Sequence, residues 1–118
     1  MVTLTPSLKE KLRQRIIRLN ANFSADAFHS MVEYLNRQSL HLVFIELETW
    51  LKDLMDKEKL DVINGLLAAL YLEIDSLDEA TKFALLAKQK FPNTDVWESI
   101  MGVVLMQKFE EQESDAKQ

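Results

Sequence analysis

The chain has 118 residues, 47% of them hydrophobic, with two Gly, two Pro and no Cys. This composition favours a single helical domain over a β-sheet protein, and it excludes a disulfide framework and thiolate chemistry. No apolar run approaches the ~18 residues that a membrane span needs, and no apolar signal core stands at the N-terminus, so we expect a cytoplasmic protein without a membrane span. The net charge is −5, and an acidic body argues against nucleic acid as the main partner.

The first helix is predicted over residues 6–19, where Thr5 can act as the N-cap and Pro6 suits the first helical position. Five basic residues against one acidic residue give positions 1–20 a charge of +4, so the rest of the chain must carry −9 to reach the total of −5. A basic amphipathic helix, to which we assign residues 1–23, can bind a membrane surface or an acidic partner. Its apolar stripe is narrow and lacks Trp and Phe, which favours a helix that packs on the acidic body. The stripe consists of Leu8, Leu12, Ile16 and Leu19.

Two more helices are predicted at about 24–37 and 39–55, and Ser24 can act as the N-cap of the first of them. The helix at 39–55 is apolar on more than one face, which is typical of a buried helix. A break is expected at 56–59, before the most regular part of the chain.

Residues 61–94 are predicted to form two helices joined by a turn at 74–76, and small residues recur in them at fixed spacing. Such a stripe of small residues lets two helices pack closely. The positions are Ala68 and Tyr71 in the first helix, Ala80, Ala84 and Ala87 in the second, and Pro92 after it. This spacing resembles the tetratricopeptide repeat, a 34-residue hairpin of two helices. Asn64 and Ala84 depart from that family, which favours Trp and an aromatic residue at these places, and an ordinary hairpin in a helix bundle is the alternative.

The helices before this hairpin resemble a degenerate copy of it. Met31 and Tyr34 occupy the places of the small residue and the aromatic residue of the first helix. Larger side chains replace the three alanines of the second helix, and these are Val43, Leu47 and Trp50. On its own, this segment would not be assigned to the repeat family.

The spacing of the hairpin starts again in the last predicted helix. Gly102 lies 34 residues after Ala68, and Leu105 lies 34 residues after Tyr71. Gly inside a helix costs about 1 kcal/mol relative to Ala. We therefore expect a close helix contact at Gly102.

The ends of this last helix are also predicted. Asn93 or Thr94 can act as its N-cap, and the helix should fade after Phe109, which leaves residues 110–118 as a polar tail. Taken together, the patterns predict an all-α protein of about six helices. We expect tetratricopeptide-like antiparallel hairpins in a right-handed superhelical stack, with residues 24–109 as the repeat domain.

We find no set of residues that would perform catalysis. His29 and His41 lie on different predicted helices, and neither has a Cys or a paired carboxylate at ligand spacing. The chain has no glycine-rich phosphate loop and no nucleophile motif. The expectation is a protein that is not an enzyme and has no catalytic residue, no cofactor and no metal ion.

The inner, concave face of such a stack is lined by fixed positions of the first helix of each unit, and these positions are mostly apolar here. An exposed apolar groove is typical of a partner site, and an amphipathic helix is the partner that suits it. The predicted partner-binding residues are Phe28, Val32, Leu35, Val62, Ala69, Leu72, Val103 and Met106. Two alternatives stay open: the N-terminal helix fills the groove, or a second copy does, which would make the chain a homodimeric scaffold module.

The repeat pattern and the stretch 95–102 resemble the small tetratricopeptide-like chaperones of bacterial type III secretion, in particular the needle-subunit chaperones of the YscG and PscG kind. The residues that carry the resemblance in the repeat are Ala68, Tyr71, Ala80, Ala87 and Pro92. The basic N-terminal helix departs from this family. The resemblance implies a chaperone that clamps the amphipathic helix of an exported subunit and prevents its premature polymerisation, with a second small helical chaperone as a further candidate partner.

Overall fold

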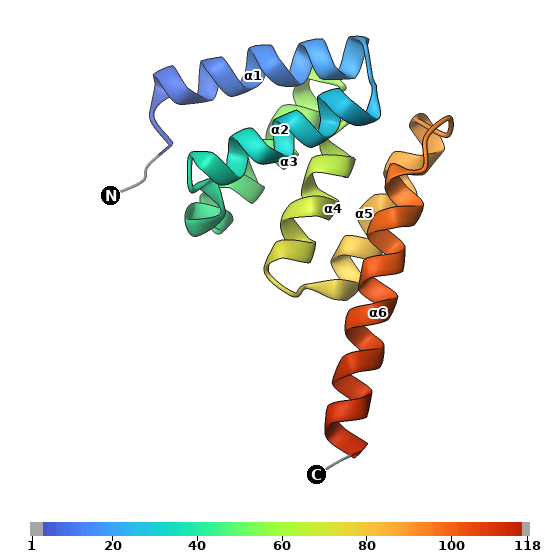
Figure 1. Ribbon diagram of the computed structural model, residues 1–118. Coiled ribbons are helices and arrows are strands. Elements are labelled where there is room, and N and C mark those ends of the chain that lie inside the picture. The colour runs from blue at the N-terminus through green and yellow to red at the C-terminus, as the bar shows by residue number, and fades with distance from the viewer. Residues whose placement is uncertain (1–3, 117–118) are drawn as a thin grey trace.

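The computed structural model describes residues 4–116, apart from the side chains of His41 and of residues 113–116, and all regular secondary structure in this range is helical (Figure 1). The elements in chain order are α1 (Pro6–Ala21), α2 (Ala25–Arg37), the 3₁₀ turn η1 (Leu40–Val43), α3 (Phe44–Glu58), α4 (Ile63–Glu73), α5 (Leu77–Lys90) and α6 (Val96–Ala116). The prediction of an all-α protein with about six helices is confirmed for the described residues.

Several helix boundaries differ from the prediction, and α3 runs through Glu58, into the break that was expected at 56–59. The third helix was expected from residue 39, but η1 takes up 40–43 and α3 begins at Phe44. Ser39, with φ 56° and ψ 31°, lies in the left-handed region and turns the chain between α2 and η1. The expected end of the last helix after Phe109 is wrong, because α6 stays helical through Ala116. Polar residues with good helix propensity, such as Glu and Gln, continue a helix without any need for burial.

The starts of α1 and α2 follow the capping residues that were predicted, whereas α6 begins at Val96, after Asp95 and not directly after Asn93 or Thr94. The Thr5 hydroxyl oxygen accepts a hydrogen bond of 3.1 Å from the backbone N–H of Leu8, with Pro6 at the first helical position. The Ser24 hydroxyl oxygen accepts an equivalent bond of 3.1 Å from Ala27. These bonds satisfy backbone donors that have no partner inside the helix, which is why such residues fix where α1 and α2 begin.

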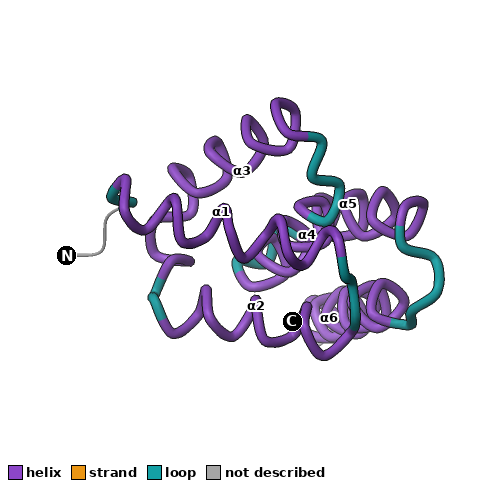
Figure 2. Tube along the Cα trace, turned by 90° about the horizontal axis from the view of Figure 1, so that it is seen from above, coloured by secondary structure: helices purple, strands orange, loops and turns teal. Residues whose placement is uncertain are grey.

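Helix α1 lies across one end of the molecule, over the space between α2 and α3 (Figure 2). Its residues Leu12, Ile16 and Leu19 are buried in the same core as the other helices. The guanidinium of Arg13 donates two hydrogen bonds, of 2.7 and 2.8 Å, to the Glu58 carboxylate near the end of α3. The interpretation of this segment as a packing helix therefore agrees with the structure.

Helices α4 and α5 form the tight hairpin that the small residues predict. Ala68 on α4 is completely buried, and so are the three stripe residues on α5, namely Ala80, Ala84 and Ala87. The rings of Tyr71 and Phe83 stack across the two helices with their centres 5.4 Å apart. The packing prediction for residues 61–94 is confirmed, and α6 packs against α5 as a third, antiparallel helix beside this pair (Figure 1).

The degenerate copy does not form a hairpin of the same kind. Helices α2 and α3 lie on either side of α1 in the view from above and do not pack closely on each other (Figure 2). Leu47 and Trp50 stand where α5 has alanines, and their bulk keeps two helix axes apart. Leu47 instead joins the common core, and α3 packs beside α4. The right-handed superhelical stack stays a prediction.

Candidate partner-binding surface

Three of the eight residues predicted to bind a partner belong to the core. Phe28, Leu35 and Val62 are almost completely buried among other side chains of the same chain. This corrects the expectation that they line an open groove. The physical reason is that α1, α4 and α6 close over the inner face of α2, so the apolar side chains there pack on one another instead of facing solvent.

Aromatic side chains fill the space between α2, α4 and α6. The rings of Phe28 and Trp97 meet edge to face, with their centres 5.1 Å apart, and Phe23 lies 5.5 Å from Trp97. The Trp97 indole N–H donates a 2.8 Å hydrogen bond to the carbonyl of Phe91. A Cβ added to Gly65 would come within 2.5 Å of the Trp97 ring, so α4 approaches this indole at the one residue without a side chain. At this end the predicted groove is filled from within.

Gly102, where we expected the close contact, has open space instead. A Cβ added there would meet no atom within 4 Å. The expectation of a close contact at Gly102 is therefore wrong for the chain alone, and the residue that needs to be Gly for packing is Gly65. Both positions are glycines inside helices, so helix propensity does not distinguish them.

The remaining predicted residues differ in accessibility. Val32, Ala69 and Leu72 are partly buried and pack against the core, so each offers only part of its side chain to a partner. Val103 and Met106 on α6 are exposed, by 40% and 65% of their surface. The structure thus leaves the α6 end of the predicted site open and closes the α2 end.

A larger apolar surface on α6 includes these two residues and two that the sequence analysis did not assign. Leu105 is 68% exposed and Phe109 is 65% exposed. Residues three or four apart are neighbours on a helix, so the four side chains form one continuous patch. The second half of α6 also projects beyond α5 (Figure 1). We call Val103, Leu105, Met106 and Phe109 the α6 apolar surface.

A signal for Leu105 was present in the sequence. Leu105 repeats the position of Tyr71, and no helix among the described residues 4–116 packs over it as α5 packs over Tyr71. Tyr71 is buried with the help of α5, whereas Leu105 has no equivalent neighbour. Among the other exposed apolar residues, Leu42 and Ile45 lie at η1 and the start of α3.

Two ion pairs join α5 to α6 beside this surface. Lys108 lies 2.6 Å from Asp78, and Lys88 lies 2.7 Å from Glu98. Hydrogen bonds from these ammonium groups hold the pKa of Asp78 and the pKa of Glu98 below their ordinary values. With Glu110 and Glu111 exposed further along α6, the surroundings of the α6 apolar surface are mainly acidic.

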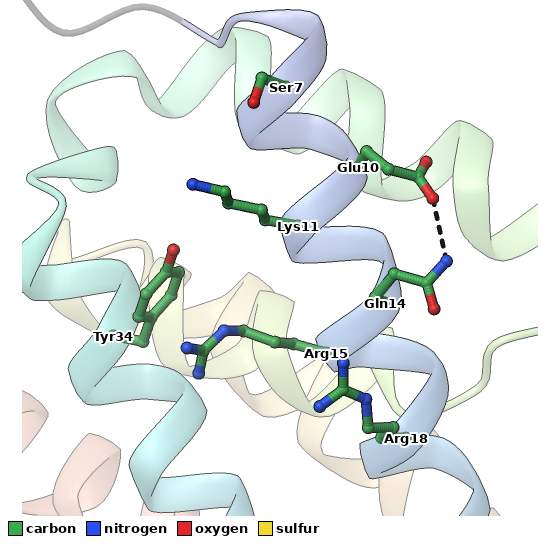
Figure 3. Close-up of a pocket in the computed structure, with 7 residues that line it drawn as sticks. All are labelled: Ser7, Glu10, Lys11, Gln14, Arg15, Arg18 and Tyr34. Carbon is green, nitrogen blue, oxygen red and sulfur yellow. Dashed lines mark hydrogen bonds between the residues drawn. The ribbon is translucent and has the colours of Figure 1, made fainter.

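The exposed side of α1 carries the opposite charge. Lys11, Arg15 and Arg18 lie along one stripe that faces α2, and none of them forms an ion pair within residues 4–112 (Figure 3). The Arg15 guanidinium lies 3.9 Å from the centre of the Tyr34 ring, a cation–π contact. The depression between them is shallow and open, and we interpret it as a solvated basic face.

Other polar contacts of the described residues join neighbouring helices. The Tyr71 hydroxyl donates a hydrogen bond to the Glu48 carboxylate, and burial raises the pKa of this phenol. Among the residues that the structure describes, no three or more His, Cys, Asp or Glu side chains gather where they could hold a metal ion. His29 is exposed, and the side chain of His41 lies outside the description. No helix within the described range is both long and apolar enough to span a membrane.

Comparison of the chain with protein-family models, with curated proteins and with solved structures finds no match. The assignment of a site therefore depends on the geometry of the molecule, and the α6 apolar surface is the strongest candidate.

Proposed function

We propose that this protein is an adaptor or chaperone that binds an amphipathic helix of another protein on the α6 apolar surface. The observation that carries the proposal is the exposure of Val103, Leu105, Met106 and Phe109 on one helix of a chain whose other long apolar stripes are buried. An apolar patch with a charged surround is typical of a protein–protein site. An amphipathic helix matches it because such a helix offers apolar side chains at the same spacing.

The finer proposal is that the partner is an exported subunit of a bacterial type III secretion needle, and that the protein acts in the cytoplasm without catalysing a reaction. Its support is the repeat pattern of residues 61–94 and the resemblance stated above. A chaperone of this class would cover the apolar helix of the subunit until export. A second small helical chaperone is a further proposed partner.

The alternative is a homodimeric scaffold in which two copies bury the same surface against each other. Size-exclusion chromatography with light scattering on the isolated protein separates the two proposals. A monomer that becomes more soluble with its partner agrees with a chaperone, whereas a tight dimer agrees with the scaffold.

The decisive experiment is a calorimetric titration with the protein that co-purifies from the native cell. Met106→Asp should weaken binding at least tenfold, because burial of a side chain of this size contributes about 1.5–3 kcal/mol and the charge must also be desolvated. Ile45→Asp is the matched control, since Ile45 is at least as exposed as Met106, by 78% against 65%, but lies on α3. Equal affinity of wild type and Met106→Asp would refute the α6 apolar surface as the site.

A further inference from the structure

The most regular part of the chain shows what normally covers the positions that are open on α6. Ala68 and Tyr71 on α4 are buried, and α5 packs on the face of α4 that carries them. Gly102 and Leu105 stand 34 residues later, at the same places on α6. There the small residue faces open space and the large one is 68% exposed. Within the described residues 4–116, α6 therefore presents the face that α4 buries, without a second helix packed on it.

Helix α5 contributes to the same open face. Asp78 and Lys88 on α5 form ion pairs with Lys108 and Glu98 on α6, so the two helices run antiparallel with a pair near each end. Leu85 lies between the two ion-paired residues of α5, and Leu105 lies between those of α6. Both leucines are exposed, by 48% and 68%. The two exposed leucines thus add apolar surface to the stretch between the two ion pairs that join α5 and α6.

Gly102 has no role in the packing of the isolated chain. A Cβ at this position would meet nothing within 4 Å, so Ala would fit and would make a better helix. A small residue at this place in the α4–α5 hairpin allows two helix axes to come close together. The lack of a side chain at Gly102 would let another helix pack closely against α6 at this position.

Charge indicates which kind of helix can pack there. Glu98 stands at one end of the open face, and Glu110 and Glu111 stand at the other. If α6 paired in the parallel direction with α6 of a second copy, Glu110 and Glu111 would meet the same two residues of the other copy, and such like-charge contacts are unfavourable. In the antiparallel direction they would lie beside Glu98, which already forms an ion pair with Lys88. A helix with Lys or Arg near the end that lies beside Glu110 and Glu111 would be complementary. If the partner helix runs antiparallel to α6, as α5 does to α4, the end beside Glu110 and Glu111 is the N-terminus of the partner helix.

We infer that the open face of α5 and α6 receives one helix from another protein, which packs on α6 as α5 packs on α4. This inference rests on the proposed function and names the chemistry of the partner helix. It carries small residues at i, i+4 and i+7, like Ala80, Ala84 and Ala87 of α5, and basic residues in its first turn. It contacts Gly102 directly and runs antiparallel to α6.

The test uses a synthetic helix and the full chain. The probe is a peptide of residues 76–91, the α5 sequence, with Asp78→Lys and Glu79→Lys and with a staple across positions 82 and 89, which are exposed on α5. Fluorescence anisotropy of the labelled peptide measures its binding to wild type, Gly102→Ala and Gly102→Leu. We expect Gly102→Ala to bind within threefold of wild type and Gly102→Leu to bind at least tenfold more weakly. The peptide with the original Asp78 and Glu79 should bind severalfold more weakly at low salt.

The protein variants are informative because the open space at Gly102 accepts a side chain in the free chain, so circular dichroism should show unchanged helix content in both. Absence of peptide binding to wild type, or equal binding by Gly102→Leu, would overturn the inference. Light scattering that shows a dimer which the peptide does not dissociate would overturn it in favour of a second copy. The broader proposed function fails separately, when Met106→Asp does not affect the natural partner.

Discussion

The substitution of each glycine by Ala gives the sharpest test of how the core is filled. At Gly65 the new Cβ would lie 2.5 and 2.6 Å from two carbons of the Trp97 ring and 3.2 Å from Phe28. The indole cannot easily move, because its N–H is bonded to the Phe91 carbonyl and its ring packs against Phe23 and Phe28. At Gly102 the same Cβ would meet no atom within 4 Å.

The two variants should therefore change stability in opposite directions. Overpacking a filled core costs about 1–3 kcal/mol, and the better helix propensity of Ala returns up to ~1 kcal/mol. Gly65→Ala should lose up to about 2 kcal/mol of unfolding free energy, whereas Gly102→Ala should gain up to ~1 kcal/mol. For a domain of this size, each kcal/mol corresponds to a change of about 3–6 °C in Tm.

Urea and thermal unfolding followed by circular dichroism measure both effects, and tryptophan fluorescence in a Trp50→Phe background reports on the surroundings of Trp97. Both variants replace a helical Gly by Ala, so the gain from helix propensity is the same in each. The difference between their stabilities therefore measures the packing at Gly65 against the packing at Gly102. If Gly65→Ala were as stable as Gly102→Ala, the contact between α4 and Trp97 would not exist in solution and the filled space between α2, α4 and α6 would be wrong.

Two more predictions concern stability. Ala84→Leu should lower the unfolding free energy by about 1–3 kcal/mol in urea unfolding, because Ala84 is completely buried on the α5 stripe that faces α4; an unchanged midpoint would count against the tight hairpin. Hydrogen bonds from Arg13 hold the pKa of the Glu58 carboxyl below its ordinary value. The carboxylate therefore stabilises the fold at pH values above the ordinary pKa, and this stabilisation is lost as the pH falls through the lowered pKa. Wild type should consequently lose more stability than Glu58→Gln between about pH 5 and pH 3, and equal losses in acid unfolding curves would show that the pair with Arg13 contributes nothing.

The sequence determined the local structure of this protein. Thr5 and Ser24 fix helix starts because their hydroxyl oxygens satisfy backbone N–H groups a few residues away. The stripe of Ala80, Ala84 and Ala87 predicts the hairpin with α4 because only small side chains let two helices approach closely. Both signals act over short distances along the chain, so they can be read without knowledge of the rest of the molecule.

Only the tertiary structure decided which apolar residues are accessible. Phe28 and Val62 have the spacing of groove residues, but α1 and the Trp97 ring close over that region. Leu105 and Phe109 stay exposed because no helix of the described part of the chain packs over them. The same holds for the two glycines, of which Gly65 meets an indole and Gly102 meets solvent. Helical periodicity indicates that one face of a helix is apolar. Whether that face is buried depends on which distant segment packs against it, and the shape and volume of side chains across the whole fold decide which segment does.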